Sequence, residues 1–224
     1  MPLDLAIGPR FSRDDLILGH SNHAAIGIID QWPDWAAPIV VLAGPVGSGK
    51  SHLAEIWLHK ANARRLLSAD IPVLLNEAET VQAVLIEDIG ETPIDETALF
   101  HLTNIQRQTN ASLLLTSRKW PRDWNIKLPD LASRLLAATV VEIAEPDDAL
   151  LSAVIAKLFA DRQVNVEPNV IAYLVNRMER SLAAAVDIVG RLDRLALEKQ
   201  VRISRALAAT IVSDTDTRQA ELDF

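Results

Sequence analysis

Cysteine is absent from the sequence, and so is any apolar run long enough to cross a membrane. Without cysteine, disulfide bonds and thiolate-ligated metal sites are both excluded. A membrane-spanning helix needs about 20 consecutive apolar residues, and the first residues lack the basic and apolar segments of a signal peptide. We therefore expect a soluble protein of the cytoplasm that does not associate with membranes.

Basic residues are scarce relative to acidic ones. The formal net charge is −8 and the pI is about 5.1. A large nucleic-acid surface depends on clustered Lys and Arg, so direct sequence-specific DNA binding is not expected. Hydrophobic residues make up 49% of the 224 residues, enough for one domain of ordinary size with a smaller one appended.

Short apolar, β-branched segments alternate with segments of helical periodicity as far as Pro146. Strands are expected at 38–43, 64–67, 81–87, 112–116 and 140–143, and helices at 24–29, 51–62, 70–77 and 95–109. This alternation predicts an α/β fold, a parallel sheet with helices on both faces. Only helical periodicity follows, at 147–161, 168–177, 182–199 and 204–212. We expect an N-terminal tail (1–14), a nucleotide-binding domain (15–146), a helical lid (147–213) and a C-terminal tail (214–224).

A phosphate-binding loop is predicted directly after the first strand. The pattern G-x-x-x-x-G-K-[ST] spans Gly44, Pro45, Val46, Gly47, Ser48, Gly49, Lys50 and Ser51, and every fixed position, at 44, 49, 50 and 51, is matched. The glycines let successive N–H groups point at phosphate oxygens, and the following helix adds the positive end of its dipole. We expect Lys50 to reach the β- and γ-phosphates of ATP or ADP and Ser51 to hold Mg²⁺. A glycine-rich turn that matches by chance is the alternative.

The third predicted strand ends in two carboxylates, Glu87 and Asp88. In a P-loop fold, one carboxylate at this place orders Mg²⁺ and the other polarises the attacking water. We assign the metal position to Glu87 and the water-activating position to Asp88. The alternative is a solvated strand end, where carboxylates are common.

The order of these motifs resembles the DnaA-like branch of the AAA+ ATPases, which includes the replication initiator DnaA and the shorter Hda type. Residues 18–25 are similar to that family's G-x-S-N-x-x-A segment, 114–117 to its sensor 1 strand, 131–135 to L-x-S-R-F and 178–185 to N-x-R-E-L-E-G-A. The resemblance covers residues 15–212 and implies a P-loop AAA+ sheet with a small all-helical lid.

The resemblance also implies roles for five residues. Leu18 and Asn22 would lie against adenine, and Thr116 would sense the γ-phosphate. Arg134 would be an arginine finger that acts in trans on the nucleotide of a neighbouring subunit, and Arg180 would reach the nucleotide from the lid. Four of the five have a plainer alternative: Asn22 as a helix cap, Thr116 as the partner of a backbone group, and both arginines as ordinary surface residues.

Departures from DnaA favour the Hda type. The sequence shows no helix-turn-helix domain after the lid, and the 32 residues between Ser51 and Val84 leave no room for DnaA's single-strand-binding insertion. The acidic pair is Glu-Asp instead of the usual Asp-Asp or Asp-Glu. Because roughly 1 Å of misplacement can cost about a hundredfold in rate, we expect nucleotide binding with weak intrinsic hydrolysis.

An Hda-type protein is expected to promote hydrolysis of DnaA-bound ATP together with the β sliding clamp of DNA polymerase III. Two terminal segments resemble clamp-binding peptides: Leu3 with Leu5, and Gln219 with Leu222 and Phe224. An independent ATPase and an adaptor that tethers DnaA to another partner remain alternatives, and assembly with further copies of the chain is left open. The tryptophans in predicted loops, Trp32, Trp35, Trp120 and Trp124, either pack over the core edge or mark a partner surface.

Overall fold

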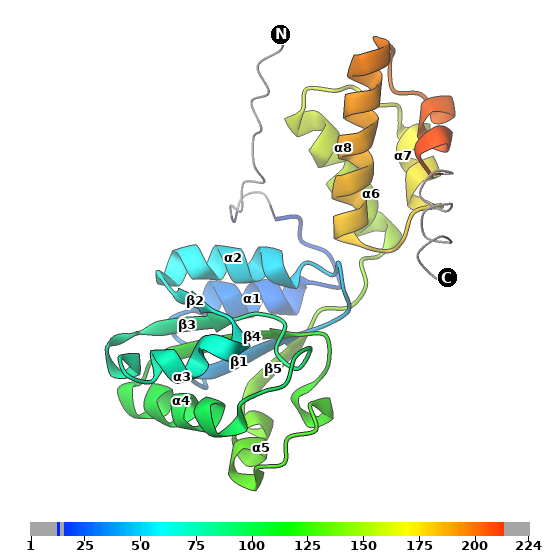
Figure 1. Ribbon diagram of the computed structural model, residues 1–224. Helices are drawn as coiled ribbons and strands as arrows, with labels where there is room; N and C mark the ends of the chain where they lie inside the picture. The colour runs from blue at the N-terminus through cyan, green and yellow to red at the C-terminus, as the bar shows by residue number, and fades with distance from the viewer. Residues whose placement is uncertain (1–12, 14–15, 213–224) are drawn as a thin grey trace. The chain divides into compact units, whose positions relative to one another are not determined.

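The computed structural model describes Arg13 and residues 16–212 (Figure 1). The predicted clamp-binding residues Leu3, Leu5, Gln219, Leu222 and Phe224 lie outside the described residues. The described chain forms two compact units. The first contains Arg13, Leu16, His23–Pro45 and Lys50–Ile143, and the second contains Ile17–Asn22, Val46–Gly49 and residues 144–212.

One five-stranded sheet forms the centre of the first unit, with the strand order β2-β3-β4-β1-β5. Its strands are β1 (Ile39–Ala43), β2 (Arg64–Leu66), β3 (Ala83–Ile86), β4 (Ser112–Ser117) and β5 (Thr139–Glu142). All four neighbouring pairs are parallel. The predicted parallel α/β sheet is therefore confirmed, and its carboxyl ends bring the loops after β1, β3 and β4 to one edge.

Helices cover both faces of the sheet (Figure 1). They are α1 (His23–Gln31), α2 (Lys50–Ala61), α3 (Ile71–Leu74), α4 (Glu96–Thr109) and α5 (Pro129–Leu136), with short 3₁₀ turns at Ser68–Asp70, Ala78–Thr80 and Pro121–Asp123. Alternate residues of β1 enter different cores: Val40 and Leu42 pack with α1 and α2, whereas Val41 packs with α3, α4 and α5. Because β1 is buried on both sides, its sequence is a continuous apolar run and not an alternating one.

The second unit is helical apart from its loop segments. It contains α6 (Asp148–Asp161), α7 (Pro168–Val175), α8 (Leu182–Lys199) and a helix over residues 205–212. Side-chain caps begin two of them: Asp147 accepts a hydrogen bond from Leu150 N–H, and Ser181 accepts one from Ala184 N–H. Such caps satisfy N–H groups that have no partner within the helix. None of the described helices has the length and apolarity needed to span a bilayer.

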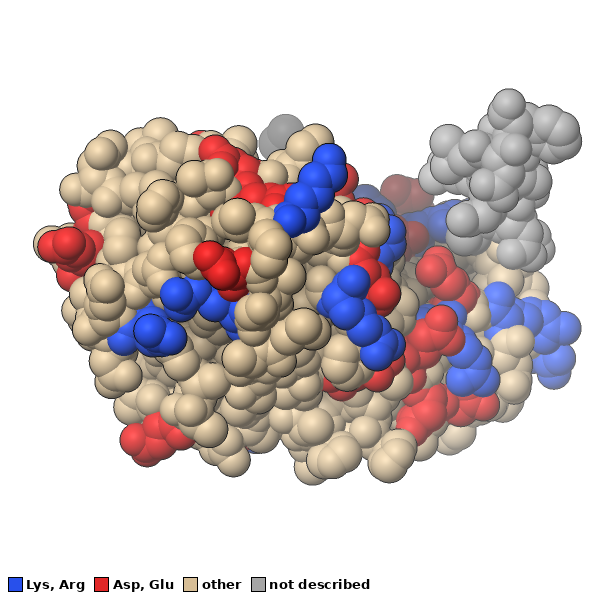
Figure 2. All heavy atoms as spheres, turned by 90° about the horizontal axis from the view of Figure 1, so that it is seen from below, with Lys and Arg blue, Asp and Glu red and all other residues tan. Residues whose placement is uncertain are grey.

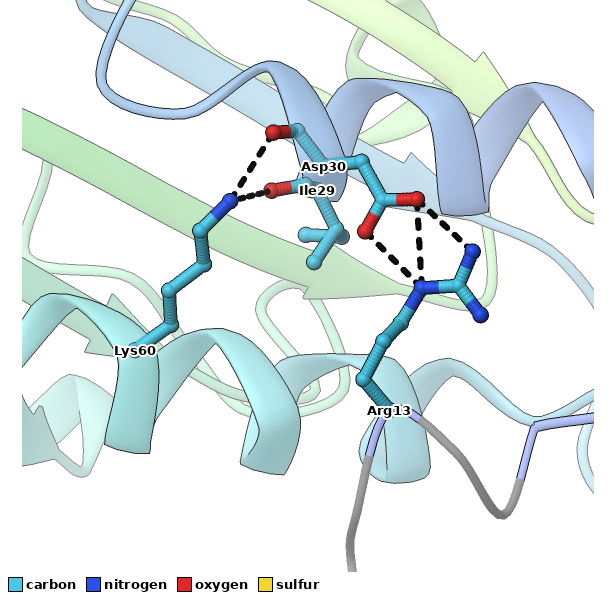
Figure 3. A network of polar contacts seen from close by, with 4 residues as sticks. All are labelled: Arg13, Ile29, Asp30 and Lys60. Atoms are coloured by element: carbon cyan, nitrogen blue, oxygen red, sulfur yellow. Dashed lines mark hydrogen bonds and ion pairs between the residues drawn. The ribbon is translucent and has the colours of Figure 1, made fainter.

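A polar network fixes the amino-terminal side of the first unit to the end of α1 (Figure 3). Arg13 donates from Nε to Asp30 Oδ1 at 2.9 Å and from a terminal nitrogen to Oδ2 at 2.8 Å. Lys60 Nζ donates to the carbonyls of Ile29 and Asp30 at the carboxyl end of α1. The Arg13 guanidinium holds the pKa of the Asp30 carboxyl below its usual value of 3.8. A bidentate pair of this kind orients both side chains.

Three tryptophans form an aromatic cluster beside the sheet. Trp57 of α2 is fully buried, Trp35 stacks on it at 5.3 Å between ring centroids, and Trp32 meets it edge-on at 6.3 Å. Both loop tryptophans also donate from their ring nitrogens, Trp32 to Ser112 Oγ and Trp35 to the Ile28 carbonyl. Of the two alternatives for these residues, packing over the core edge is the one that the structure shows.

Charges are mixed on the face drawn in Figure 2. Lys and Arg side chains lie among Asp and Glu side chains there, and the described residues on that face form no continuous basic area. Several cations of the described chain are paired, including Arg64 with Glu77 at 2.6 Å and Arg118 with Glu91 at 3.2 Å. This face therefore lacks the clustered positive charge that binding to a nucleic-acid backbone requires.

Candidate nucleotide-binding site

The predicted phosphate loop connects the end of β1, Ala43, with the first residue of α2, Lys50. Gly47 and Gly49 have φ angles of +74° and +103°, which non-glycine residues rarely adopt. This backbone turns the loop from a buried strand directly into a helix amino terminus, where N–H groups lack intrahelical partners. The local geometry is therefore that of an anion-binding loop.

The tip of the loop contacts the start of α8. The Leu182 N–H donates to the Gly47 carbonyl at 2.8 Å. A Cβ atom at Gly47 would lie 1.9 Å from Ser181 Oγ, so there is no space for a side chain. Arg180, the residue predicted to reach the nucleotide, directly precedes Ser181, and its guanidinium pairs with Asp148 at 2.8 Å on the surface.

Lys50 is 5% exposed, and its side chain turns back toward the loop. Its Nζ donates to the carbonyls of Gly44 at 2.8 Å and Pro45 at 2.7 Å. Burial lowers the pKa of Lys50, and the nearby Asp88 carboxylate opposes part of that shift. A cation desolvated in this way interacts strongly with an anion that enters the loop.

The loop residues fit a phosphate group. Ser48 is 3% exposed, and its hydroxyl has no hydrogen-bond partner among the described residues. Buried polar groups normally have partners, so the Ser48 hydroxyl is available to a ligand oxygen. With the Lys50 ammonium and the amino terminus of a 12-residue helix, the donor set is suited to an oxyanion.

Two strand ends beside the loop are linked through Thr116. This residue is completely buried on β4, and its Oγ1 accepts a hydrogen bond from the Asp88 N–H at 2.9 Å. Its carbonyl accepts another from the Ile89 N–H at 2.9 Å. The Thr116 hydroxyl thus satisfies a backbone group, which is the plainer of the two roles considered for it. That group is the N–H of the predicted catalytic residue Asp88, whose φ is +49°.

Ser117 is a connecting residue that the sequence analysis did not single out. Its hydroxyl donates to the Ile89 carbonyl at 2.9 Å and accepts from Trp124 Nε1 at 3.0 Å. Its own carbonyl accepts from the Gly44 N–H at 3.1 Å. Ser117 therefore joins the phosphate loop and the acidic segment to β4. The available signal was a second hydroxyl directly after Thr116, at the end of a strand whose centre is apolar.

Arg65 is a second residue near the site that the sequence analysis missed. It lies on the edge strand β2, and its Nε pairs with Glu87 Oε2 at 3.2 Å. One of its terminal nitrogens also pairs with Glu55 of α2. Finding this contact from sequence would have required the β2–β3 register, in which Arg65 is opposite Leu85, two residues before Glu87.

The donor chemistry near the loop also fits a magnesium ion. Magnesium prefers oxygen ligands and usually takes only one or two from the protein, with phosphate oxygens and water as the rest. Ser51 is exposed at the start of α2, and Glu87 is half-buried. No group of three or more His, Cys, Asp or Glu suited to a metal occurs within the described residues, so a metal here would need the phosphates as further ligands.

The other predicted site residues are placed as follows. Asn22 is 6% exposed; its Oδ1 accepts from the Gly19 N–H at 2.8 Å, and its Nδ2 donates to the Ile17 carbonyl at 2.9 Å. It therefore closes its own loop and leaves Leu18 65% exposed. Arg134 of α5 is half-buried, with its guanidinium carbon 4.9 Å from the centre of the Phe100 ring.

No protein-family model matches the chain. The chromosomal replication initiator protein DnaA of Thermomicrobium roseum is 24% identical over 244 residues, which cover 95% of this chain and 51% of that protein. Domain III of DnaA from Thermotoga maritima has the same fold, with a TM-score of 0.78 at 16% identity over 92% of this chain and 97% of that one. The chain is therefore similar in sequence to DnaA and shares the fold of DnaA domain III. It spans about half the length of the curated relatives it matches.

The DnaA-like fold also matches a replication initiator DnaA bound to AMPPCP and single-stranded DNA. That structure has a TM-score of 0.74 at 17% identity and covers 87% of this chain and 69% of that one. In the protein described here, the phosphate loop, the acidic segment and Thr116 lie at the carboxyl ends of β1, β3 and β4. Ligands bind at this edge of open α/β sheets.

Proposed function

We propose that this DnaA-like protein binds ATP or ADP and regulates replication initiation by promoting hydrolysis of DnaA-bound ATP, together with the β sliding clamp of DNA polymerase III. This is the Hda-type role that the sequence resemblance implies. The observation that carries the proposal is a complete phosphate loop, Gly44–Ser51, built into a DnaA-like fold. A regulator of this kind would act in the cytoplasm, where its partners are.

Nucleotide binding is supported by the groups around the loop. Lys50 and the unpartnered Ser48 hydroxyl would contact the phosphates, and Gly47 and Gly49 would let the backbone approach them. The loop closed by Asn22 would present Leu18 to the base. A structural neighbour with the same fold binds the ATP analogue AMPPCP, which favours an adenine nucleotide here.

Ser51 and Glu87 would hold Mg²⁺ on the nucleotide, where the ion would neutralise phosphate charge. The protein's own residues suggest weak intrinsic hydrolysis. Glu87 is engaged by Arg65, and Asp88 is the shorter acid in the water-activating position. Because Thr116 fixes the Asp88 backbone, the backbone cannot move to offset the shorter side chain. Asp88 would therefore orient a water molecule less closely than the usual longer acid.

Arg134 would act on the nucleotide of a neighbouring DnaA molecule. Its stacking on Phe100 restrains a long side chain without neutralising its charge. A restrained guanidinium is suited to stabilise charge on a transferring phosphoryl group, because less side-chain entropy is lost when it binds. Arg180 would reach nucleotide only after it exchanges Asp148 for phosphate.

Clamp binding is proposed on the terminal sequences alone. Leu222 and Phe224 with Gln219, or Leu3 with Leu5, form short patterns of the kind that insert apolar side chains into a pocket. The adaptor alternative would need a partner surface, and the loop that holds Trp32 and Trp35 is less favoured for it. Both tryptophans pack on Trp57. The independent-ATPase alternative is decided by the same assay as the leading proposal.

The test is hydrolysis of ATP bound to DnaA, with and without clamp loaded on DNA. We expect clamp-dependent stimulation by the wild type and none by Arg134→Ala. Arg107→Ala is the matched control, because Arg107 is an exposed arginine on the neighbouring helix α4. Lys50→Ala should lose nucleotide binding. Hydrolysis by the chain alone, independent of DnaA, would favour the ATPase alternative, and DnaA binding without stimulation would favour the adaptor.

A further inference from the structure

Arg65 connects two carboxylates that come from different elements of the first unit. Its Nε lies 3.2 Å from Glu87 Oε2, directly after β3, and a terminal nitrogen pairs with Oε2 of Glu55 on α2. Both carboxylates are more enclosed than the arginine: their side chains are 24% and 17% exposed, against 44% for Arg65. Glu87 is therefore already paired with a cation that belongs to the fold.

The strand register explains why these side chains meet. Arg65 pairs with Leu85 across the parallel β2–β3 ladder, and Glu87 follows Leu85 by two residues. Side chains two residues apart on a strand lie on the same face, and Leu85 packs in the core with α2. The neighbouring Arg64 lies on the opposite face, where it pairs with Glu77.

The contacts extend into the helix that begins at the phosphate loop. His59 Nε2 lies 3.2 Å from Glu55 Oε1, so His59, Glu55, Arg65 and Glu87 form one continuous row of charged or polar groups. The row begins on α2, whose first residue is Lys50. The predicted metal ligand Glu87 is thus held toward β2 and α2 by groups other than a metal.

We propose that Arg65 is a built-in counter-ion of Glu87 that competes with the divalent cation, so that nucleotide binding depends only weakly on Mg²⁺. The inference rests on the proposed nucleotide binding. A guanidinium and a divalent cation on one carboxylate repel each other, and Arg65 has already neutralised the Glu87 charge that would attract the ion. Glutamate suits this pairing because its extra methylene lets the carboxylate reach across to β2.

Arg65→Gln removes the competing charge and keeps a polar side chain of similar reach. We expect Mg²⁺ to strengthen nucleotide binding by this variant several-fold more than nucleotide binding by the wild type. The size of the difference is set by the Arg65–Glu87 ion pair, which is partly exposed and is worth a factor of about five in the binding constant. Arg64→Gln is the matched control, since it removes an equally exposed arginine from the same strand. Glu87→Gln should abolish the Mg²⁺ effect in either background.

The measurement is the dissociation constant of a fluorescent ADP, determined in EDTA and in millimolar magnesium chloride. The expected result is a small ratio between the two constants for the wild type and Arg64→Gln, and a larger ratio for Arg65→Gln. An unchanged or smaller ratio for Arg65→Gln would overturn the inference. If that variant does not fold, Glu87→Asp tests the same point, because the shorter acid withdraws from Arg65. Failure of the wild type to bind the probe in either buffer would instead reject nucleotide binding.

Discussion

Replacing Gly47 with alanine should disturb the phosphate loop and the start of α8 together. Gly47 is not a fixed position of the loop pattern, so the motif alone would tolerate a side chain there. In the structure its φ is +74°, and an added Cβ would lie 1.9 Å from Ser181 Oγ and 2.7 Å from Ser181 Cβ. These atoms belong to the residue that caps α8, so the clash cannot be relieved by a flexible chain end.

Three contributions set the expected loss of stability. A left-handed backbone costs a non-glycine residue about 1–2 kcal/mol. Displacing the Ser181 hydroxyl from its cap costs about 1 kcal/mol. Loss of the Leu182–Gly47 hydrogen bond costs about 1 kcal/mol more. We therefore expect Gly47→Ala to lower the free energy of unfolding of the second unit by about 3–4 kcal/mol.

A double substitution separates the clash from the backbone strain. Ser181→Gly removes the obstructing side chain and by itself costs only a few tenths of a kcal/mol at a cap. Gly47→Ala combined with Ser181→Gly should therefore lose only about 2 kcal/mol, chiefly the strain, and be more stable than Gly47→Ala alone. Urea denaturation followed by far-UV circular dichroism is the suitable assay, because all five tryptophans lie in the first unit. Strictly additive losses would refute the predicted contact between Gly47 and Ser181.

Two further predictions concern the first unit. Gln106 is fully buried on α4, and neither its amide nitrogen nor its amide oxygen has a partner among the described residues. Gln106→Met should therefore raise the free energy of unfolding by about 1–2 kcal/mol. A lower melting temperature would contradict this. Because Arg13 lowers the folded pKa of Asp30 below 3.8, their pairing stabilises the fold above that value and is lost as the pH falls through the lowered pKa. Asp30→Asn should thus cost under about 1 kcal/mol at neutral pH, as expected for an exposed pair, and nothing in acid; an equal difference at both pH values would exclude the pairing as its cause.

The centre of the sheet could be predicted from the sequence because β1, β3 and β4 are buried on both faces. Runs such as the one ending at Ala43 have no polar residues to interrupt them, and Pro and Gly mark their ends. The phosphate loop was equally accessible, since its chemistry depends on residues close together in the sequence. The roles of Arg134, Arg180 and Leu18 remain predictions, because each depends on a ligand or partner.

Contacts between segments far apart in the sequence could not be predicted. The link between Thr116 and Asp88 joins residues 28 positions apart, and the pairing of Arg65 with Glu87 requires the register of an edge strand only three residues long. Even a local contact can differ from the expected ones: the sequence allows Asn22 as a helix cap or a base contact, and its side chain closes the preceding turn. In each case, local preference allows several partners and the tertiary structure selects one.

The strand order has a consequence for synthesis. β1 is flanked by β4 and β5, which are the last two strands to be translated. The segment leading into the phosphate loop therefore emerges from the ribosome early. It has no neighbouring strand until residues up to Ser117 have followed, and it lacks its second neighbour until Glu142. Because non-local strand pairing forms slowly, the apolar run from Ile39 to Ala43 is open to non-native association during this interval.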